Sequence, residues 1–127
     1  MGKIAAPLGI GVDIEEIKRF RGKKLPRDER FLKTIFTPRE LTYCFGKSDP
    51  GSHLAARFAA KEAAWKALTA AKKLNSHLAP FLRDVEILNE TNGVPRMTFF
   101  SPKLRMRSAS VSLAHSRTYA IAIVCVS

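Results

Sequence analysis

Hydrophobic residues recur at the spacing of an α-helix over several stretches of the first half of the chain. The longest predicted helix runs from about residue 53 to 73, and large apolar side chains follow one side of it: Leu54, Phe58, Trp65 and Leu68. Shorter helices are predicted over 15–23 and 27–36. Thr37 and Glu40 match the capping box that begins a further helix.

After Pro80 apolar and polar residues alternate, which is the period of a β-strand. Four strands are predicted in this half of the chain: 84–90, 95–100, 108–116 and 118–126. Asn92 and Gly93 form a strong hairpin signal between the first two of them. Another strand is predicted over residues 8–14. The pattern predicts the α+β class, as a single domain over residues 1–127 in which a mostly antiparallel sheet packs on one long helix.

Composition and charge narrow the function classes. The chain has 127 residues, of which 46% are hydrophobic, and this excludes an intrinsically disordered protein. The net charge of +11 predicts a surface that attracts polyanions such as nucleic acid, a phosphorylated ligand or an acidic protein. No apolar run reaches the roughly 18 residues that a membrane span requires. Two cysteines provide no disulfide framework, which indicates a reducing, intracellular compartment.

Asp13 directly follows the first predicted strand, and two interpretations of this acid are open. It could cap a short helix over 14–20. It could also bind a hard cation such as Mg²⁺, which proteins commonly hold with one or two carboxylates while phosphates and water complete the coordination.

Glu62 and Lys66 are four residues apart, so they share one face of the long predicted helix. An exposed ion pair worth about 0.3–0.5 kcal/mol is the common explanation of this spacing. Arg57 and Lys61 are also four residues apart, and their like charges repel each other unless an anion neutralises them. A carboxylate that binds Mg²⁺, surrounded by cations that bind phosphates, would account for both pairs.

His115 is predicted in the turn between the last two strands, either as a surface residue or as a contact to a phosphate or a base. The residue spacing offers no support for a zinc site, for a serine-histidine-acid triad or for a glycine-rich phosphate loop.

Two stretches of the chain resemble the two signature motifs of the 4′-phosphopantetheinyl transferases. GVDIEEIKRF (11–20) resembles the first motif, a strand that ends in glycine, a hydrophobic residue and aspartate and continues to a Lys-Arg pair. RFAAKEAAWKAL (57–68) resembles the second motif, and the matching residues are Phe58, Lys61, Glu62, Ala63 and Lys66. The motif spacing, the length and the closing VSLAHSRTYAIAIV are similar to the small holo-acyl-carrier-protein synthase branch over nearly the whole chain.

The resemblance implies transfer of 4′-phosphopantetheine from coenzyme A to a serine of an apo acyl carrier protein, with adenosine 3′,5′-bisphosphate as by-product. It implies that Asp13 and Glu62 bind Mg²⁺ and that Lys66 meets the phosphates of coenzyme A, so these are the implied catalytic residues. The serine proton would go to Glu62 itself or to a water molecule on the metal. Further implied coenzyme A contacts are Arg57, Lys61, His115, Asn92 and Pro95.

Acyl carrier proteins are strongly acidic, and the resemblance implies that basic residues after the first motif receive the carrier: Arg19, Arg21, Lys23, Lys24 and Arg30. It also implies a homotrimer with sites at the subunit interfaces. The chain departs from bacterial members in LTAAKKLN (68–75), which lacks the usual glycine turn, and in Val94 before Pro95. The missing turn and the high pI favour a mitochondrial location in a eukaryote over the cytoplasm of a bacterium.

Two other functions compete with this hypothesis. A small basic nucleic-acid-binding protein would suit residues 91–127, which carry five Lys/Arg and no acid, but no nucleic-acid-binding motif is present and we expect no such partner. An inactive module that docks carrier proteins would not need Asp13, Glu62 and Lys66 together.

Overall fold

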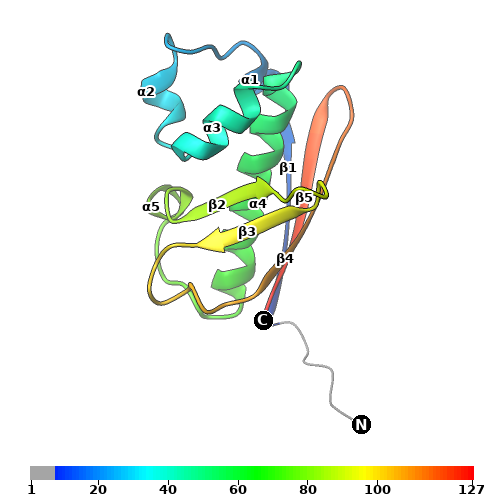
Figure 1. Cartoon of the computed structure of the whole chain (residues 1–127). Helices are drawn as coiled ribbons and strands as arrows, with labels where there is room; N and C mark the ends of the chain where they lie inside the picture. The colour runs from blue at the N-terminus through cyan, green and yellow to red at the C-terminus, as the bar shows by residue number, and fades with distance from the viewer. Residues whose placement is uncertain (1–7) are drawn as a thin grey trace.

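The computed structural model describes residues 8–127. One long helix, α4 (Pro50–Ala70), runs along the length of the molecule, and the other elements pack around it (Figure 1). The helix begins and ends three residues before the predicted positions. Pro50 starts it because proline supplies the helical φ angle at the first turn, and Lys72, with a φ of 58°, turns the chain away after its end.

Two antiparallel sheets contact this helix. The three-stranded sheet has the order β1-β5-β4, with the bounds β1 (Gly9–Glu16), β5 (Tyr119–Val126) and β4 (Ala109–His115). The predicted hairpin is formed by β2 (Val85–Asn89) and β3 (Pro95–Phe99), and Gly93 supplies the positive φ of 85° in its turn. The predicted α+β architecture and all the predicted strands are confirmed, although the strands divide between two sheets.

Short helices complete the fold. The first three surround the N-terminal end of α4 in Figure 1: α1 (Lys18–Arg21), α2 (Glu29–Leu32) and α3 (Pro38–Phe45). The capping box predicted for α3 is confirmed, because Thr37 and Glu40 exchange both hydrogen bonds. One further short helix, α5 (Leu78–Leu82), was not predicted.

The helix predicted over 27–36 is wrong in extent, because only α2 is helical there. Thr37 precedes a proline, which disfavours the helical conformation, and its backbone is extended with φ of −74° and ψ of 160°. Ile35 and Phe36 therefore leave the helix as a turn and enter the hydrophobic core.

Strand β1 lies very close to α4 through its small residues. A Cβ atom at Gly11 would overlap the carbonyl oxygen of Ala63, and one at Gly9 would overlap that of Ala67. The side chains of β1 alternate between the two faces of the sheet. The inner face continues from the glycines to Asp13 and Glu15, whereas the outer face carries three exposed aliphatic residues: Ile10, Val12 and Ile14.

The outer face of β5 extends this apolar surface. Ile121 lies opposite Ile14 and Ile123 lies opposite Val12, and both are exposed. Among the helices of residues 8–127, none has the length and apolar character needed to cross a membrane.

Candidate active site

Asp13 lies inside β1, opposite Ala122, and does not cap a helix. The helix-cap interpretation is therefore wrong, because the strand continues to Glu16 and the first helical turn begins only at Lys18. The Asp13 side chain points toward α4 and is only 9% exposed.

Three carboxylates from β1 and α4 meet at this point, and we call Asp13, Glu15 and Glu62 the acid cluster. One oxygen from each lies within 4.8 Å of the other two. Asp13 Oδ2 is buried and accepts no hydrogen bond from any of residues 8–127. Glu15 was not predicted from the sequence as a site residue, although it lies two residues from Asp13 and strand alternation places both on the same face.

Burial and like charge raise the proton affinity of this cluster. Burial is the main cause that raises the pKa of Glu62 to about 7, and the neighbouring carboxylates of Asp13 and Glu15 raise it further. Burial also raises the pKa of Glu15, which Arg19 opposes from 3.2 Å. Three acids with this little compensation form a site that attracts a cation.

Lys66 supplies one positive charge to the acid cluster. Its Nζ lies 2.9 Å from Asp13 Oδ1 and donates a second hydrogen bond of 3.2 Å to the Val12 carbonyl. The hydrogen bond to Asp13 raises the pKa of Lys66. The side chain remains 48% exposed. The ion pair with Glu62, one of the two explanations of the Glu62–Lys66 spacing, is replaced by an ion pair with Asp13.

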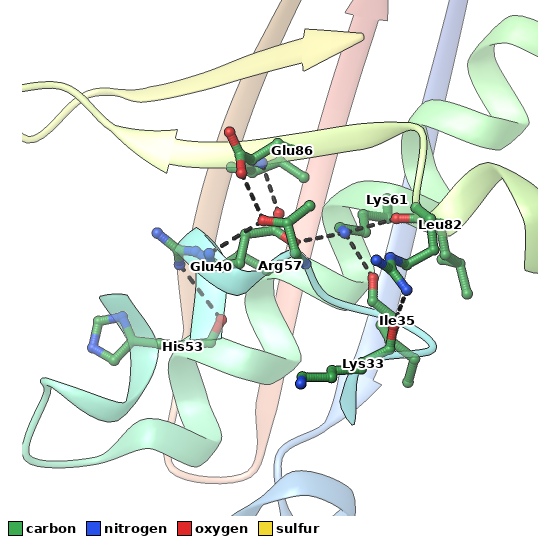
Figure 2. Close-up of polar contacts among 11 residues, drawn as sticks. Lys33, Ile35, Glu40, His53, Arg57, Lys61, Leu82 and Glu86 are labelled. Atoms are coloured by element: carbon green, nitrogen blue, oxygen red, sulfur yellow. Dashed lines mark hydrogen bonds and ion pairs between the residues drawn. The ribbon is translucent and has the colours of Figure 1, made fainter. Parts of the chain in front are cut away.

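Lys61 has a different environment from the one predicted. Its ammonium is fully buried and donates to the carbonyls of Ile35 at 2.7 Å and Leu82 at 2.8 Å (Figure 2). The carboxylate of Glu40 lies 2.7 Å away. The expectation that an external anion neutralises Lys61 is therefore wrong, because Glu40 is the anion. Being buried, Lys61 presents no surface to coenzyme A in this structure.

Arg57 is also buried, with 1% exposure. Its Nη2 donates to Asn89 Oδ1 at 2.7 Å, and its guanidinium lies 4.2 Å from the centre of the Tyr43 ring. Arg57 thus joins α4 to the β2–β3 hairpin and to α3 from inside the protein. Its Nη1 also donates to the His53 carbonyl at 3.4 Å (Figure 2).

The remaining predicted coenzyme A contacts come from segments other than α4. His115 is exposed at the end of β4, and its ring centre is 6.3 Å from that of His53. Asn92 is exposed in the hairpin turn, where its Oδ1 accepts a 3.0 Å hydrogen bond from the backbone N–H of Val94. Pro95 begins β3. A cavity of about 460 Å³ lies beside Asn89, lined also by Pro38, Arg39, Thr42, Tyr43 and Leu88.

The basic residues predicted to receive a partner follow β1, on the segment that includes α1 and α2. Arg19 extends to the acid cluster through its 3.2 Å ion pair with Glu15. Three of the others line a cavity of about 350 Å³ with apolar residues Leu25 and Phe45, and they are Arg21, Lys23 and Lys24. Arg30 is exposed on α2. A larger cavity of about 670 Å³ adjoins the acid cluster and is lined by Ile14, Glu15, Glu16, Lys18 and Arg19.

Comparison with known proteins identifies the family to which this chain belongs. Residues 9–124 match the model of the 4′-phosphopantetheinyl transferase superfamily. A holo-[acyl-carrier-protein] synthase of Protochlamydia amoebophila is 44% identical over 120 residues, covering 91% of this chain and 93% of the relative. One of Chlamydia trachomatis serovar D is 42% identical over 121 residues, covering 91% and 95%. The Helicobacter pylori holo-[acyl-carrier-protein] synthase, solved in complex with coenzyme A, is 33% identical with a TM-score of 0.73, covering 93% of this chain and 99% of that one.

The chain belongs to the 4′-phosphopantetheinyl transferase superfamily, as its two motifs indicated. Within the superfamily it falls in the holo-[acyl-carrier-protein] synthase branch. These relatives are bacterial, so the absence of a glycine turn after α4 does not separate this chain from bacterial members.

Proposed function

We propose that this protein is a holo-[acyl-carrier-protein] synthase, which transfers 4′-phosphopantetheine from coenzyme A to a serine of an apo acyl carrier protein and releases adenosine 3′,5′-bisphosphate. The observation that carries the proposal is that Asp13, Glu62 and Lys66, from two separate motifs, lie together at one site. The bacterial relatives favour the cytoplasm as its location.

The acid cluster fits Mg²⁺. Its donors are carboxylate oxygens, which this cation prefers, and the buried Asp13 Oδ2 is without a hydrogen-bond partner within residues 8–127. The raised pKa of Glu62 reflects burial first and the like charges of Asp13 and Glu15 second, and a divalent cation would compensate both. We therefore assign Asp13, Glu15 and Glu62 as the Mg²⁺ ligands, one more than the sequence predicted. When bound, Mg²⁺ would neutralise the phosphate oxygens of the leaving bisphosphate.

The chain's own residues supply the remaining chemistry. Lys66, half-exposed beside Asp13, binds the same phosphates by charge-assisted hydrogen bonds. Glu62 accepts the proton of the carrier serine, because its carboxylate lies in the acid cluster beside Asp13, whose partner Lys66 binds the phosphates of coenzyme A. The serine oxygen then attacks the phosphorus next to pantetheine, and the bond from that phosphorus to the bisphosphate breaks.

The nucleotide end of coenzyme A has a fitting surface near His115. Tyr43 and His53 lie with ring centres 5.8 Å apart, and His115 follows beside His53. The cavity of about 460 Å³ next to Tyr43 offers an aromatic wall to a base. We propose that His115, Asn92 and Pro95 contact coenzyme A, and that the buried Arg57 supports this surface from behind through Asn89.

The exposed outer face of β1 and β5 supports the homotrimer. Ile10, Val12 and Ile14 are 60%, 51% and 59% exposed, and Ile121 and Ile123 continue the patch. Contiguous aliphatic surface of this kind marks a protein interface. We propose that neighbouring subunits cover it in the trimer.

The acidic carrier would approach over the basic segment from Arg19 to Arg30. Arg19 links this segment to Glu15, so a carrier helix bound there would bring its serine to the acid cluster. Charge attraction of this kind raises the association rate and weakens with salt.

Intact-mass spectrometry of an apo acyl carrier protein incubated with this protein, coenzyme A and Mg²⁺ tests the proposal. We expect the carrier to gain one phosphopantetheine, and we expect no gain with EDTA or with Glu62→Gln. Asp84→Asn, which changes an exposed acid outside the acid cluster, is the matched control and should keep the activity. No gain with several carriers, together with salt-dependent binding to nucleic acid, would refute the transferase and favour a nucleic-acid-binding protein.

A further inference from the structure

The contact between β1 and α4 repeats along the helix. Gly11 packs on Ala63, and Gly9 packs on Ala67, one helical turn further. Alanines continue this row at spacings of four residues, with buried Ala59 and Ala55 before Ala63 and with Ala71, which also lies close to Gly9, after Ala67. A second row of buried alanines, Ala56, Ala60 and Ala64, lies beside it. A shift of α4 by one turn, about 5.4 Å, would replace alanine by alanine against the glycines of β1. Apolar packing on this side therefore specifies the axial position of the helix weakly.

Lys61 lies on the opposite side of α4, because two residues turn a helix by about 200° from Ala63. That side carries the large apolar residues of the helix, spaced by four and three residues. Lys61 occupies the central position of this series, which reads Leu54, Phe58, Lys61, Trp65, Leu68. A single buried polar residue within such an apolar stripe is a known way to fix the register between packed elements.

The partners of Lys61 come from three separate segments. They are the carbonyl of Ile35 before α3, the carboxylate of Glu40 on α3 and the carbonyl of Leu82 at the end of α5. Glu40 is itself held, since it accepts hydrogen bonds from the backbone N–H groups of Thr37 at 2.9 Å and Ile87 at 2.8 Å. Figure 2 shows the ammonium enclosed by these groups. A one-turn shift would break all three contacts.

We propose that Lys61, through its ion pair with Glu40, is a positioning residue that fixes the axial register of α4 and so holds Glu62 beside Asp13 and Glu15. Glu62 follows Lys61 directly on the helix, so the register of one determines the position of the other. The inference rests on the metal-binding role proposed above for the acid cluster.

The test replaces the ion pair by neutral side chains of similar size, in the double variant Lys61→Met with Glu40→Gln. Such replacements keep many proteins folded. Mn²⁺ alone, titrated by electron paramagnetic resonance, reports on the acid cluster without coenzyme A or carrier. We expect Mn²⁺ to bind at least tenfold more weakly to the folded double variant than to wild type. Lys73→Met, which removes an exposed lysine beyond the end of α4, should bind as wild type does.

Each outcome decides a different point. Failure of wild type to bind Mn²⁺ would refute the proposed metal site and the inference with it. Wild-type affinity in the folded double variant would refute only the positioning role, since a purely structural pair lowers stability without changing the affinity of folded protein. If the double variant does not fold, Lys61→Arg decides. Its larger guanidinium keeps the charge but requires α4 to shift, so binding at least threefold weaker supports the proposal and unchanged binding contradicts it.

Discussion

Lys61 and Glu62 are neighbours in sequence, but their charges have contrasting environments. The Lys61 ammonium is fully buried and has three oxygen partners within 2.8 Å. The Glu62 carboxylate lies against Asp13 and Glu15, and its pKa is raised to about 7 by burial and by these like charges. Two adjacent residues of the helix thus differ sharply, since the charge of Lys61 is compensated and that of the acid cluster around Glu62 is only partly compensated.

The contrast distinguishes a positioning role from direct ligand binding. Buried polar groups in proteins are nearly always paired, so the network around Glu40 needs nothing from outside. Asp13 Oδ2 is buried and has no hydrogen-bond partner in the part of the chain that the structure describes, and burial of this kind has a cost that a ligand can remove. A substitution on the Lys61 side of α4 should therefore lower stability and act on the metal only through the position of the helix, whereas one on the Glu62 side should change ligand binding directly.

The largest expected effect comes from Glu40→Ala, which removes the anion that pairs with the buried Lys61. The variant leaves the buried Lys61 charge without its anion, and it leaves the N–H groups of Thr37 and Ile87 unpaired. We expect a loss of about 3–5 kcal/mol in the free energy of unfolding, measured by urea denaturation. Glu29→Ala, which removes an exposed ion pair with Lys33, should cost below about 0.5 kcal/mol. Equal losses of unfolding free energy in Glu40→Ala and Glu29→Ala would show that the buried ion pair has no greater effect on folding than an exposed one.

On the other side, Glu62→Gln should remove stabilisation by metal rather than stability itself. A ligand at 100 times its Kd stabilises the folded state by about 2.7 kcal/mol. We expect Mg²⁺ to raise the Tm of wild type and to leave that of Glu62→Gln unchanged. Without metal the variant should be at least as stable as wild type, because one of three like charges is gone. A variant that Mg²⁺ stabilises as it does wild type would show that Glu62 is not a ligand.

Gly11→Ala tests the close approach that brings the acid cluster together. The new Cβ would overlap the Ala63 carbonyl, so β1 must move away from α4. We expect a loss of about 1–3 kcal/mol in unfolding free energy, together with weaker Mn²⁺ binding. Gly22→Ala is the matched control, because a Cβ there meets no atom of residues 8–127 within 4 Å. If Gly11→Ala kept wild-type stability and affinity, the glycine contact would not position the cluster.

The smallest expected effect is on the pH dependence of stability without metal. The folded pKa of Glu62, about 7, lies above its ordinary value of 4.5, so the folded protein binds the proton more tightly than the unfolded chain. Stability should therefore fall as the pH rises from about 4.5 to about 7 and then level off. Solvent screening of the half-buried Glu62 keeps the change modest. Unfolding midpoints across this range should vary less in Glu62→Gln, and an equal slope would assign the titration to another group.

Local patterns in the sequence identified the important single residues more reliably than they identified the partners of these residues. The capping box identified Glu40 at the start of α3, but its second role as the anion of Lys61 depends on a contact between residues 21 positions apart in sequence. Lys61 falls within the apolar series of the long helix, between Phe58 and Trp65, so a local signal that its side chain points inward was present and was missed. Nothing local indicates the same for Arg57, whose burial depends on contacts with Tyr43 and Asn89.

Glu15 shows the opposite case, in which the signal was present. Strand alternation from Asp13 places Glu15 on the same face, but a helix had been predicted from residue 15 onward. The strand in fact continues through Glu16, paired with Tyr119. Assigning the end of β1 two residues too early was enough to hide one member of the acid cluster.

The alternation of β1 also limits how this protein can change by insertion or deletion. Because the strand carries carboxylates on one face and aliphatic residues on the other, one residue gained or lost before Asp13 would exchange the two faces for the rest of the strand. Charged groups would then lie on the apolar patch, and Ile14 would point at Glu62. The length of β1 before Asp13 therefore determines the position of both the acid cluster and the apolar patch, and length variation is better tolerated in the loops that follow α1 and α4.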